Sequence, residues 1–483
     1  MLFNSLSYLA FFAIVLCVYW ALPWHRARLG FLLLASWTFY LAWYPIYLFL
    51  FLAVTAVNYF AALGVAATRD ERPDWSRRIV VATVIVDLGN LALFKYYDFF
   101  VQSGAALAHS LTGVEWSPPM SDIFLPLGIS FYSFQMMAYV IDLGRRQIDV
   151  IRNPLKMSLF IAFFPQLIAG PIVRAREFIG QLASRRSFEL RRFLHGLDLI
   201  AFGLFKKVLI ADQLAPFVDG VFAAPDGRDP VTLLVAVYAY SAQIYCDFSG
   251  YTDIGRGCAY CLGYELPRNF RSPYLSVNVT EFWRRWHITL SNWLRDYLYI
   301  PLGGNRSGPL RTYLNLIITM GLGGLWHGAS WTFVIWGLLH GGALALTRFV
   351  HERRGVAPTE PLLPGRLYRL FSIVATFHFV SLAWIFFRAQ TFDTAFTILA
   401  GLVGIHLDGA AAALNLGRFT LVIVAVSLMV AGVLHLATVL AIQGRWHQRA
   451  AWAWGRPAVY FIVMVGLTLF ADRGAQQFIY FQF

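Results

Sequence analysis

Long apolar runs separated by short polar links dominate this sequence, and they predict helices that cross a membrane. The candidate spans are roughly 6–22, 29–43, 46–67, 79–97, 123–143, 155–172, 193–215, 231–250, 312–326, 328–347, 367–387, 391–404, 418–442 and 457–471. A helix needs about 20 apolar residues to cross a hydrocarbon core of about 30 Å. Several runs are shorter or contain glycine or proline, so we expect about 11 to 13 transmembrane or partial helices. The predicted fold class is an all-α polytopic membrane protein.

Basic residues gather in some of the links and are scarce in others, which predicts an orientation. The basic links are 68–78, 173–192, 351–368 and 443–456, and the links poor in basic residues are 98–122, 216–230 and 405–417. Cytoplasmic loops of membrane proteins carry an excess of lysine and arginine. We therefore expect the first group in the cytoplasm and the second group on the outer side.

The composition agrees with a membrane protein. Of the 483 residues, 58% are hydrophobic and 13% are charged, whereas soluble domains average roughly 25% charged residues. The net charge of +13 comes from the basic links, which meet anionic lipid, so it does not indicate nucleic acid. The run 6–22 lacks the basic start and the cleavage site of a signal peptide, and we interpret it as a retained helix. Residues 1–483 are predicted to form one membrane domain, with its functional core at about 123–347.

Residues 281–300 have the pattern of an amphipathic helix at about 100° per residue. The tryptophans and leucines fall on one arc and the arginines on the other. This is typical of a helix that lies in a membrane interface with its indoles at headgroup level. Asn278 or Thr280 is expected to cap the start, and Pro301 follows the end. His287 falls within the apolar arc, where a histidine that merely faced water would not lie.

Residues 312–347 contain no Asp, Glu, Lys or Arg. One helix of that length would extend roughly 54 Å, well beyond the apolar core, and both flanks are basic. We therefore expect the segment to enter the membrane and return, with a break supplied by the glycines at 321, 323, 324 and 328. His327 lies beside this break, and an ionisable side chain at membrane depth is a functional-site hypothesis by default. The alternative is a structural histidine that hydrogen-bonds a backbone carbonyl freed by the break.

Polar residues at membrane depth also occur in three other stretches, which are 125–146, 163–174 and 240–257. Irregular or polar structure survives there only where protein or water satisfies it, so all three are predicted to pack inward against 281–342. Gln243 and Asp247 lie in the third stretch, and Asp247 and Asp253 are candidate partners for an arginine or a histidine. The alternative is that both carboxylates lie at a helix end near the interface.

A buried neutral histidine is suited to general base catalysis, because desolvation lowers its pKa and keeps it unprotonated near neutral pH. It can take the proton of a hydroxyl that attacks an acyl thioester. The sequence contains no nucleophile-elbow, phosphate-loop, zinc-protease or dinucleotide-binding motif, and no metal site is predicted. Cys258 and Cys261 form an isolated CxxC pair, which without a second pair is weak support for zinc or redox chemistry. His340 is interpreted as structural.

Several runs of the chain resemble the membrane-bound O-acyltransferase (MBOAT) family. They are PLGISFYSFQ (126–135), FFPQLIAGPIVR (163–174), YCDFSGYTDIGRG (245–257), NFRSPYLSVNVTEFWRRWHITLSNWLRDYLYIPLGGN (269–305) and GLWHGASWTFVIWGLLHG (324–341). Within the family they look like the bacterial alginate O-acetyltransferases and the related D-alanyl transfer proteins. The closing run FIYFQF also resembles the alginate type.

The resemblance implies an MBOAT-type bundle of about 11 to 13 transmembrane or partial helices around a central cavity, with interfacial and re-entrant helices. The family histidine of the WHG motif falls on His327, and a second family position, which is His or Asn, falls on His287. We expect His327 to be the general base and His287 to orient or bind the donor. The expected supporting or substrate-binding residues are Trp283, Arg284, Arg285, Trp286, Asn292, Trp293, Arg295, Asp296, Trp326, Asp247 and Gln243.

The resemblance also implies a function, which is transfer of an acetyl group from a cytoplasmic thioester toward an exported polysaccharide such as alginate. Acetyl-CoA or another acyl thioester is the expected donor substrate, and no bound cofactor is expected. The expected surroundings are the lipids of the bacterial inner membrane, a periplasmic SGNH-type acetyltransferase and a polysaccharide acceptor, reached directly or indirectly. Similar chains serve cellulose, peptidoglycan and teichoic acid.

Two other functions compete with the enzyme. One is a transporter or flippase subunit for a sugar or a lipid-linked sugar, with the broken helices as its binding site. The other is a scaffold that recruits an export complex. An internal repeat would favour the transporter, and the sequence contains none. The paired histidines favour the enzyme.

Overall fold

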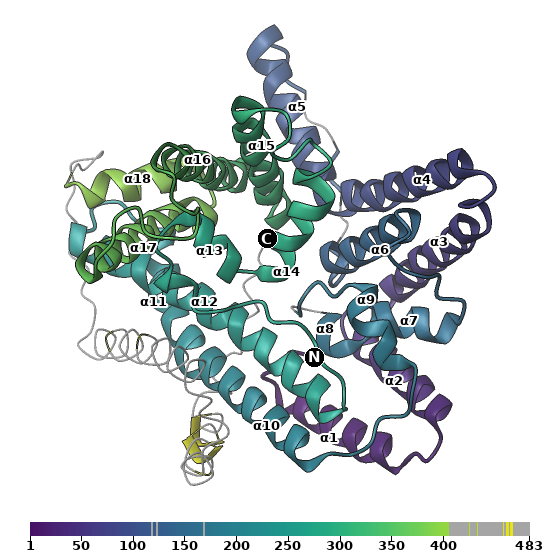
Figure 1. Ribbon diagram of the computed structural model, residues 1–483. Coiled ribbons are helices and arrows are strands. Elements are labelled where there is room, and N and C mark those ends of the chain that lie inside the picture. The colour runs from purple at the N-terminus through teal and green to yellow at the C-terminus, as the bar shows by residue number, and fades with distance from the viewer. Residues whose placement is uncertain are drawn as a thin grey trace. The chain divides into compact units, whose positions relative to one another are not determined.

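The computed structural model describes residues 1–404 except 117–118, 122–123 and 168–169, together with residues 425, 432, 457, 460–462 and 464–466 (Figure 1). Within these ranges the chain is helical and contains no strand, which confirms the predicted all-α class. The predicted outer loop 405–417 and the basic segment 443–456 lie outside the described residues, as does most of the two predicted spans 418–442 and 457–471.

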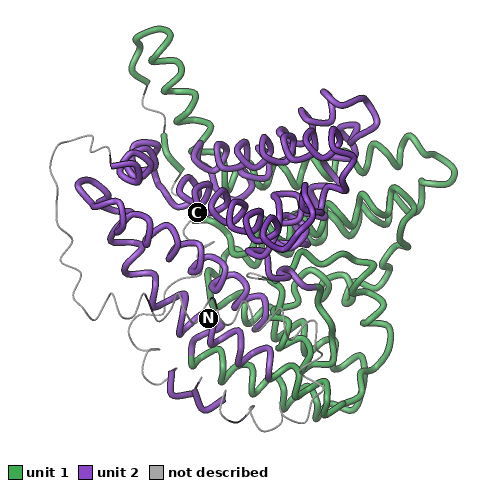
Figure 2. Tube along the Cα trace, turned by 60° about the vertical axis from the view of Figure 1, so that its left-hand side comes forward, with its two compact units in different colours: residues 1, 6–197, 255–267 green, residues 2–5, 198–254, 268–483 purple. Residues whose placement is uncertain are grey.

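The chain divides into two compact units, which Figure 2 distinguishes by colour. Unit 1 contains α1 (Leu6–Ala21), α2 (His25–Leu41), α3 (Ile46–Thr68), α4 (Pro73–Leu91), η1 (Ala92–Tyr96), α5 (Tyr97–Thr112), α6 (Ile129–Gly144), α7 (Pro154–Ala162), α8 (Phe164–Leu167), α9 (Ala175–Phe178) and η2 (Ile179–Leu182). Unit 2 contains η3 (Phe205–Ala211), α11 (Asp212–Ala223), η4 (Pro273–Leu275), α13 (Val279–Arg285), α14 (Ile288–Leu294), η5 (Arg295–Tyr299), α15 (Pro309–His327), α16 (Trp331–Arg354), α17 (Arg366–Arg388) and α18 (Phe392–Leu402). Helices α10 (Leu190–Leu204) and α12 (Pro230–Cys261) contribute residues to both units.

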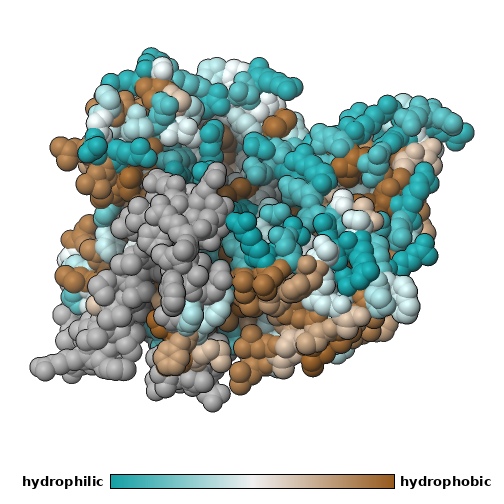
Figure 3. Space-filling model, turned by 60° about the horizontal axis from the view of Figure 1, so that its bottom comes forward, coloured by the Kyte–Doolittle hydropathy of each residue, from teal (hydrophilic) through white to brown (hydrophobic). Residues whose placement is uncertain are grey.

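Five helical stretches in the described part of the chain are long and apolar enough to cross a membrane. They are Ile46–Thr68, Pro73–Thr112, Pro230–Cys261, Trp331–Arg354 and Arg366–Arg388. Large apolar side chains such as Leu34, Phe49 and Phe60 are exposed on unit 1. Figure 3 shows hydrophobic and hydrophilic residues gathered in separate areas of one face of the surface. These features are expected of a multi-pass membrane protein.

The prediction of an outer loop at 98–122 was wrong for its first part. Residues 97–112 are helical, because α4 continues through the π-helical turn η1 directly into α5. The stretch contains no proline, and Gly104 is tolerated inside the helix; Gly113 adopts a left-handed conformation (φ 70°) and ends α5. An excess or lack of basic charge indicates the side of the membrane and does not by itself indicate a loop.

The predicted break in the apolar stretch 312–347 is confirmed, but only one of the proposed glycines lies in it. Helix α15 ends at His327, Gly328 is extended, and α16 starts at Trp331. Gly321, Gly323 and Gly324 lie inside α15, where two of them allow α16 to approach closely. A Cβ at Gly324 would overlap the backbone carbonyl of Phe333 on α16. Most of this glycine run therefore serves helix packing.

Residues 281–300 do not form one interfacial helix, and this prediction was wrong. Helix α13 ends at Arg285, Trp286 is extended, and His287 is left-handed before α14 begins. The indoles of Trp283, Trp286 and Trp293 are buried in the protein and do not form an exposed apolar face. The start was predicted correctly, because Oδ1 of Asn278 accepts a hydrogen bond from the backbone N–H of Glu281 at 2.9 Å.

The three polar stretches differ in structure. Helix α6 is buried over nearly its whole length and packs against α3 and α4 in unit 1. The chain leaves helical geometry between α8 and α9, where proline and glycine predicted a break. The stretch 240–257 is instead an unbroken part of α12. Gly250 lies within this helix and packs against the backbone of Gly203, both in unit 2.

Candidate active site

His327 is the last residue of α15 and lies where the α15–α16 hairpin turns. The turn is closed by Ser330, whose Oγ accepts a hydrogen bond from the backbone N–H of Thr332 at 3.3 Å and so caps α16. The His327 side chain is 3% exposed. The sequence therefore places an imidazole inside the protein at a helix end, as predicted from the break.

Three aromatic rings surround the imidazole of His327. The ring centroids of Trp326, Trp336 and Phe387 lie 5.0, 5.1 and 5.2 Å from its centroid. The Trp336 ring is perpendicular to the imidazole, at an interplanar angle of 90°. Edge-to-face contacts of this kind are favourable and fix the orientation of a ring. The contacts come from α15, α16 and α17, so three helices hold one histidine.

His287 occupies a strained backbone position between α13 and α14. Its φ of 40° and ψ of 55° are left-handed, which costs about 1–2 kcal/mol for a residue with a Cβ. Asn269 holds this turn from outside both helices. Its backbone carbonyl accepts from the N–H of Ile288 at 3.0 Å, and its Oδ1 accepts from Oγ1 of Thr289 at 2.6 Å. Strain that neighbouring groups maintain in this way is common at functional sites.

The two predicted histidines lie together. Their ring centroids are 6.3 Å apart, and Trp326 contacts both, at 5.9 Å from His287 and 5.0 Å from His327. The ring of Phe248 on α12 packs edge-on against His287 at 4.7 Å. His287 is fully buried and lies outside the five candidate spans, and burial lowers its pKa to about 3. Its imidazole is therefore neutral across the physiological pH range.

His340 lies in the same aromatic cluster and has a structural contact. The indole Nε1 of Trp283 donates to Nδ1 of His340 at 3.2 Å, and the ring of Phe282 stacks on the imidazole at 6.0 Å. The indole of Trp336 contacts His340 at 4.9 Å and His327 at 5.1 Å. His340 thus joins α13 to α16, and Figure 1 shows these two helices beside each other.

The other residues predicted around the histidines have varied positions. Trp286 is fully buried against Phe270 and Trp384, with ring centroids at 5.0 and 5.1 Å. Arg284 and Arg295 are exposed, Asn292 is half-buried, and Trp293 packs on Tyr297. Arg285 pairs with Glu281 at 2.5 Å and Arg295 with Asp296 at 2.7 Å. Of the predicted set, Trp326 is thus the residue in ring contact with both histidines.

Asp247 has a lysine as its partner, and the predicted arginine or histidine was wrong. Nζ of Lys207 lies 2.7 Å from Oδ1 of Asp247 and 2.7 Å from Oδ1 of Asp212, and all three side chains are largely buried. The neighbouring Lys206 pairs with Asp253 at 2.5 Å. Gln243 is buried one turn before Asp247 on α12. Since Asp247 directly precedes Phe248, this ion pair fixes the part of α12 that contacts His287.

We expect Lys207→Met to destabilise the protein by about 3 kcal/mol, because it leaves two buried carboxylates without their cation. Thermal unfolding of the purified protein in detergent measures this. Lys206→Met is the matched control, since that lysine and its carboxylate are more exposed. Addition of Asp247→Asn to Lys207→Met is expected to restore part of the stability. Equal losses for the two lysine variants would contradict this assignment.

Sequence reasoning missed Phe248, Trp336 and Phe387, which all touch a candidate histidine. Phe248 and Trp336 lie inside the runs that carry the family resemblance, so their position was a usable signal. Phe387 is far from the motifs along the chain, and nothing in its local sequence distinguishes it from other aromatic residues of α17.

The CxxC pair of α12 is buried in unit 1. Sγ of Cys258 lies 3.2 Å from the hydroxyl of Tyr8 on α1, and Cys261 packs against Gly196. Among the residues that the structure describes, no group of three His, Cys, Asp or Glu side chains is placed to hold a metal ion. The candidate site itself contains two buried imidazoles in an aromatic enclosure.

Comparison with known proteins gives the same class of chemistry. Residues 144–389, which include both histidines, match the model of the membrane-bound O-acyltransferase family. The chain is 42% identical over 445 residues to the probable alginate O-acetylase AlgI of Azotobacter vinelandii, covering 92% of this chain and 85% of that protein. It is 40% identical over 398 residues to the probable alginate O-acetylase AlgI of Pseudomonas aeruginosa, covering 82% and 73%. It is 38% identical over 404 residues to the peptidoglycan O-acetyltransferase of Helicobacter pylori, covering 78% and 73%.

Proposed function

Because the chain belongs to the membrane-bound O-acyltransferase family, we propose that it moves an acetyl group from a cytoplasmic thioester toward an exported polysaccharide. The protein is a multi-pass membrane O-acyltransferase. The acetyl group and the polysaccharide are inferred from relatives that are named as alginate O-acetylases and as a peptidoglycan O-acetyltransferase.

The pair of buried histidines is the observation that carries this proposal. Transfer to a hydroxyl needs a group that removes its proton, and a buried neutral imidazole is suited to that task. His327 and His287 lie within 6.3 Å of each other between ring centroids, in an enclosure that limits water. Exclusion of water matters because water would otherwise accept the acetyl group and hydrolyse the thioester.

We assign the role of general base to His327. The acceptor oxygen attacks the thioester carbonyl carbon while His327 takes its proton. The carbon–sulfur bond then breaks, and the departing thiolate receives that proton, which leaves an ester and a free thiol. Burial lowers the pKa of His287 to about 3, so its imidazole stays neutral. Its role is therefore to orient or bind the donor as a neutral hydrogen-bonding group.

The charge pattern predicts which side of the membrane is cytoplasmic, and the family resemblance implies the donor and the partner. The basic links predict a cytoplasmic face on which an acyl thioester, for example acetyl-CoA, enters. The acetyl group then leaves on the other side of the bacterial inner membrane. A periplasmic SGNH-type acetyltransferase is the proposed partner that completes the transfer to polymer, so the acceptor at His327 is either the polymer or this partner.

The test uses purified protein in nanodiscs with acetyl-CoA that carries a radiolabelled acetyl group. We expect release of free CoA and transfer of label when a periplasmic extract of the source cell is present. The same protein with a boiled extract is the control for hydrolysis. If acetyl-CoA is not consumed with either extract, the proposal is wrong and the transporter becomes the better interpretation.

A further inference from the structure

One ring nitrogen of His340 on α16 is fixed as a hydrogen-bond acceptor. The indole Nε1 of Trp283 on α13 donates to Nδ1 of His340 at 3.2 Å. An indole has a donor and no acceptor, so Nδ1 offers its lone pair and carries no proton. The imidazole is therefore the neutral tautomer with its proton on Nε2. This one hydrogen bond determines which nitrogen of His340 is a donor.

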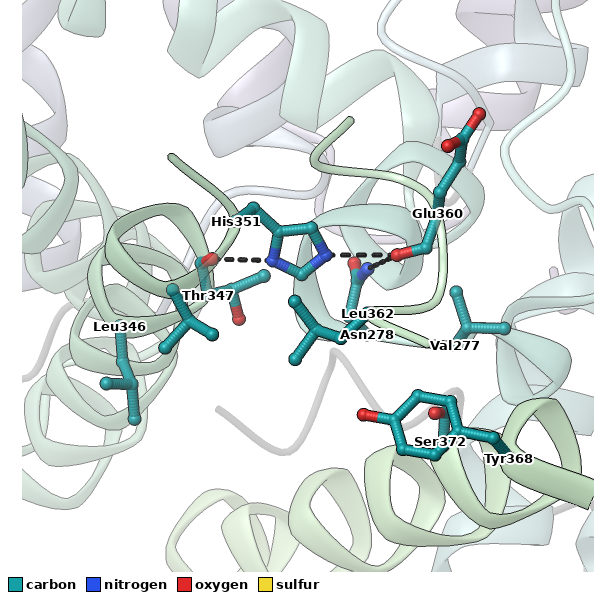
Figure 4. A pocket seen from close by; sticks show the side chains of 10 residues that line it. Val277, Asn278, Leu346, Thr347, His351, Glu360, Leu362, Tyr368 and Ser372 are labelled. Carbon is teal, nitrogen blue, oxygen red and sulfur yellow. Dashed lines mark hydrogen bonds between the residues drawn. The ribbon is translucent and has the colours of Figure 1, made fainter. Parts of the chain in front are cut away.

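The N–H group at Nε2 of His340 has no acceptor in the part of the chain that the structure describes, and the side chain is fully buried. A buried donor without an acceptor costs roughly 1–3 kcal/mol, and native proteins contain few of them. His351, further along α16, shows the usual arrangement. Its Nδ1 lies 2.7 Å from the carbonyl oxygen of Thr347, and its Nε2 lies 3.0 Å from that of Glu360 (Figure 4). His340 thus differs from a histidine whose two nitrogens are both satisfied.

Trp336 carries a second donor of this kind. Its Nε1–H group is buried and has no acceptor among the described residues. The ring centroid of Trp336 lies 4.9 Å from that of His340 and 5.1 Å from that of His327. Trp336 and His340 are four residues apart on α16, which brings their side chains to one face of the helix. Two neighbouring rings therefore each carry a buried N–H group without an acceptor, and one of these rings touches the general base.

The acyl transfer assigned to His327 places negative charge on the carbonyl oxygen of the acyl group. When the acceptor oxygen attacks the carbonyl carbon, the second electron pair of the C=O bond moves onto that oxygen. The return of this pair re-forms the C=O bond and expels the thiolate. N–H donors at the carbonyl oxygen lower the barrier, and they act most strongly where water is excluded. Because His327 itself binds the acceptor hydroxyl, the carbonyl oxygen is the acceptor left for the two free donors.

We propose that Nε2–H of His340 and Nε1–H of Trp336 bind the carbonyl oxygen of the acyl group and stabilise its negative charge in the transition state. This inference rests on the proposed function. It makes His340 and Trp336 catalytic residues, in addition to the contact by which His340 joins α13 to α16. Trp283 is a positioning residue, since its hydrogen bond keeps the proton of His340 on Nε2.

The test compares His340→Phe with His351→Phe, the same change at the histidine of α16 whose two nitrogens are both satisfied. Each variant is purified in nanodiscs and assayed for release of CoA from acetyl-CoA with the periplasmic extract present. We expect His340→Phe to lower kcat about 50-fold, because one hydrogen bond to a developing charge is lost. KM should not rise, since this bond strengthens only in the transition state. His351→Phe should lower the unfolding temperature and leave kcat close to that of wild type.

A second substrate separates charge stabilisation from packing. In the dithioester analogue of acetyl-CoA, sulfur replaces the carbonyl oxygen and is only a weak hydrogen-bond acceptor. The same steps then give a thionoester and free CoA. We expect wild type and His340→Phe to turn over this analogue at similar rates, although they differ with acetyl-CoA. A packing defect would slow the variant equally with both substrates, and that result would overturn the inference.

The outcomes also separate this inference from the proposed function. A kcat of His340→Phe near that of wild type overturns the inference, while wild-type turnover keeps the function. Absence of wild-type turnover overturns the function and the inference with it.

If His340→Phe does not accumulate, Trp336→Phe takes its place and must show the same loss with acetyl-CoA alone. Its control is Trp384→Phe, because the Trp384 ring stacks on Trp336 at 5.4 Å and its indole interacts with the hydroxyl of Tyr274. Failure of both variants to accumulate would show that these side chains are needed for folding, and would overturn the inference.

Discussion

Replacement of His327 by alanine is expected to abolish acyl transfer while the protein still accumulates in the membrane. General base catalysis contributes roughly 10²–10⁴ to a rate, so the residual activity should be on the order of 10⁻³ of wild type. The three rings around the imidazole leave a cavity in this variant, which makes a moderate loss of stability a further expected result. Release of CoA from acetyl-CoA, per unit of membrane-inserted protein, measures the effect.

A matched control is His378→Ala on α17, because His378 is an exposed histidine that hydrogen-bonds Tyr238 at 2.7 Å. It should retain near-normal turnover. His327→Ala with near-normal turnover at a normal protein level would contradict the assignment of the general base. Equal losses in the two variants would indicate a general effect of histidine removal on folding.

His287→Ala is expected to cause the second largest loss, about 10²-fold in kcat, with some activity remaining because His327 is still present. His287→Asn should recover part of the rate, since the amide keeps a hydrogen-bonding group of similar size in a left-handed position that asparagine tolerates. Turnover of both variants at saturating acetyl-CoA measures this. A His287→Ala variant that matched wild type would reduce this histidine to a packing role.

The pH dependence of stability gives a separate measurement on His287. Its folded pKa of about 3 lies below the ordinary value of 6.5, so the unfolded chain binds the proton more readily. The folded state therefore loses stability as pH falls from about 6.5 toward 3, and gains nothing from this group above 6.5. Thermal unfolding of His287→Asn should fall less steeply over that window than wild type. If the unfolding temperatures of the two proteins fell in parallel over this pH range, the prediction that burial lowers the pKa of His287 would be contradicted.

The sequence predicted the parts of the site that depend on local pattern. The missing charges of 312–347 predicted the hairpin and placed His327 at its turn, and the apolar arc of 281–300 predicted that His287 does not face water, although the single helix was wrong. It did not predict the left-handed turn at His287, because that turn is held by Asn269, which lies outside the helical pattern. The helical periodicity of a segment predicts which of its faces is buried. It does not show that a residue elsewhere in the chain, here Asn269, hydrogen-bonds and fixes the turn.

Contacts between segments that are far apart in the sequence could not be predicted from local patterns either. Lys207 was not foreseen as the partner of Asp247, since both lie in largely apolar runs and opposite charges in such runs do not reveal which ones meet. Phe387 reaches His327 from a helix with many aromatic residues. The glycines inside α15 were predicted to break the helix, but they lie within it, and two of them allow close packing against α16. Glycine can serve either purpose because it has no Cβ.

The backbone contact between α15 and α16 limits how this enzyme can be changed. A Cβ at Gly337 would overlap the carbonyl of Met320, and one at Gly341 would lie 2.7 Å from Cα of Ile317. Two helices that meet main chain to main chain cannot slide or separate without losing that contact, so the hairpin carries His327 as one rigid piece. Attempts to accept a bulkier acyl group by redesign should therefore leave the hairpin intact and enlarge the aromatic side facing it, where Phe387 and Phe248 are side chains that can be trimmed.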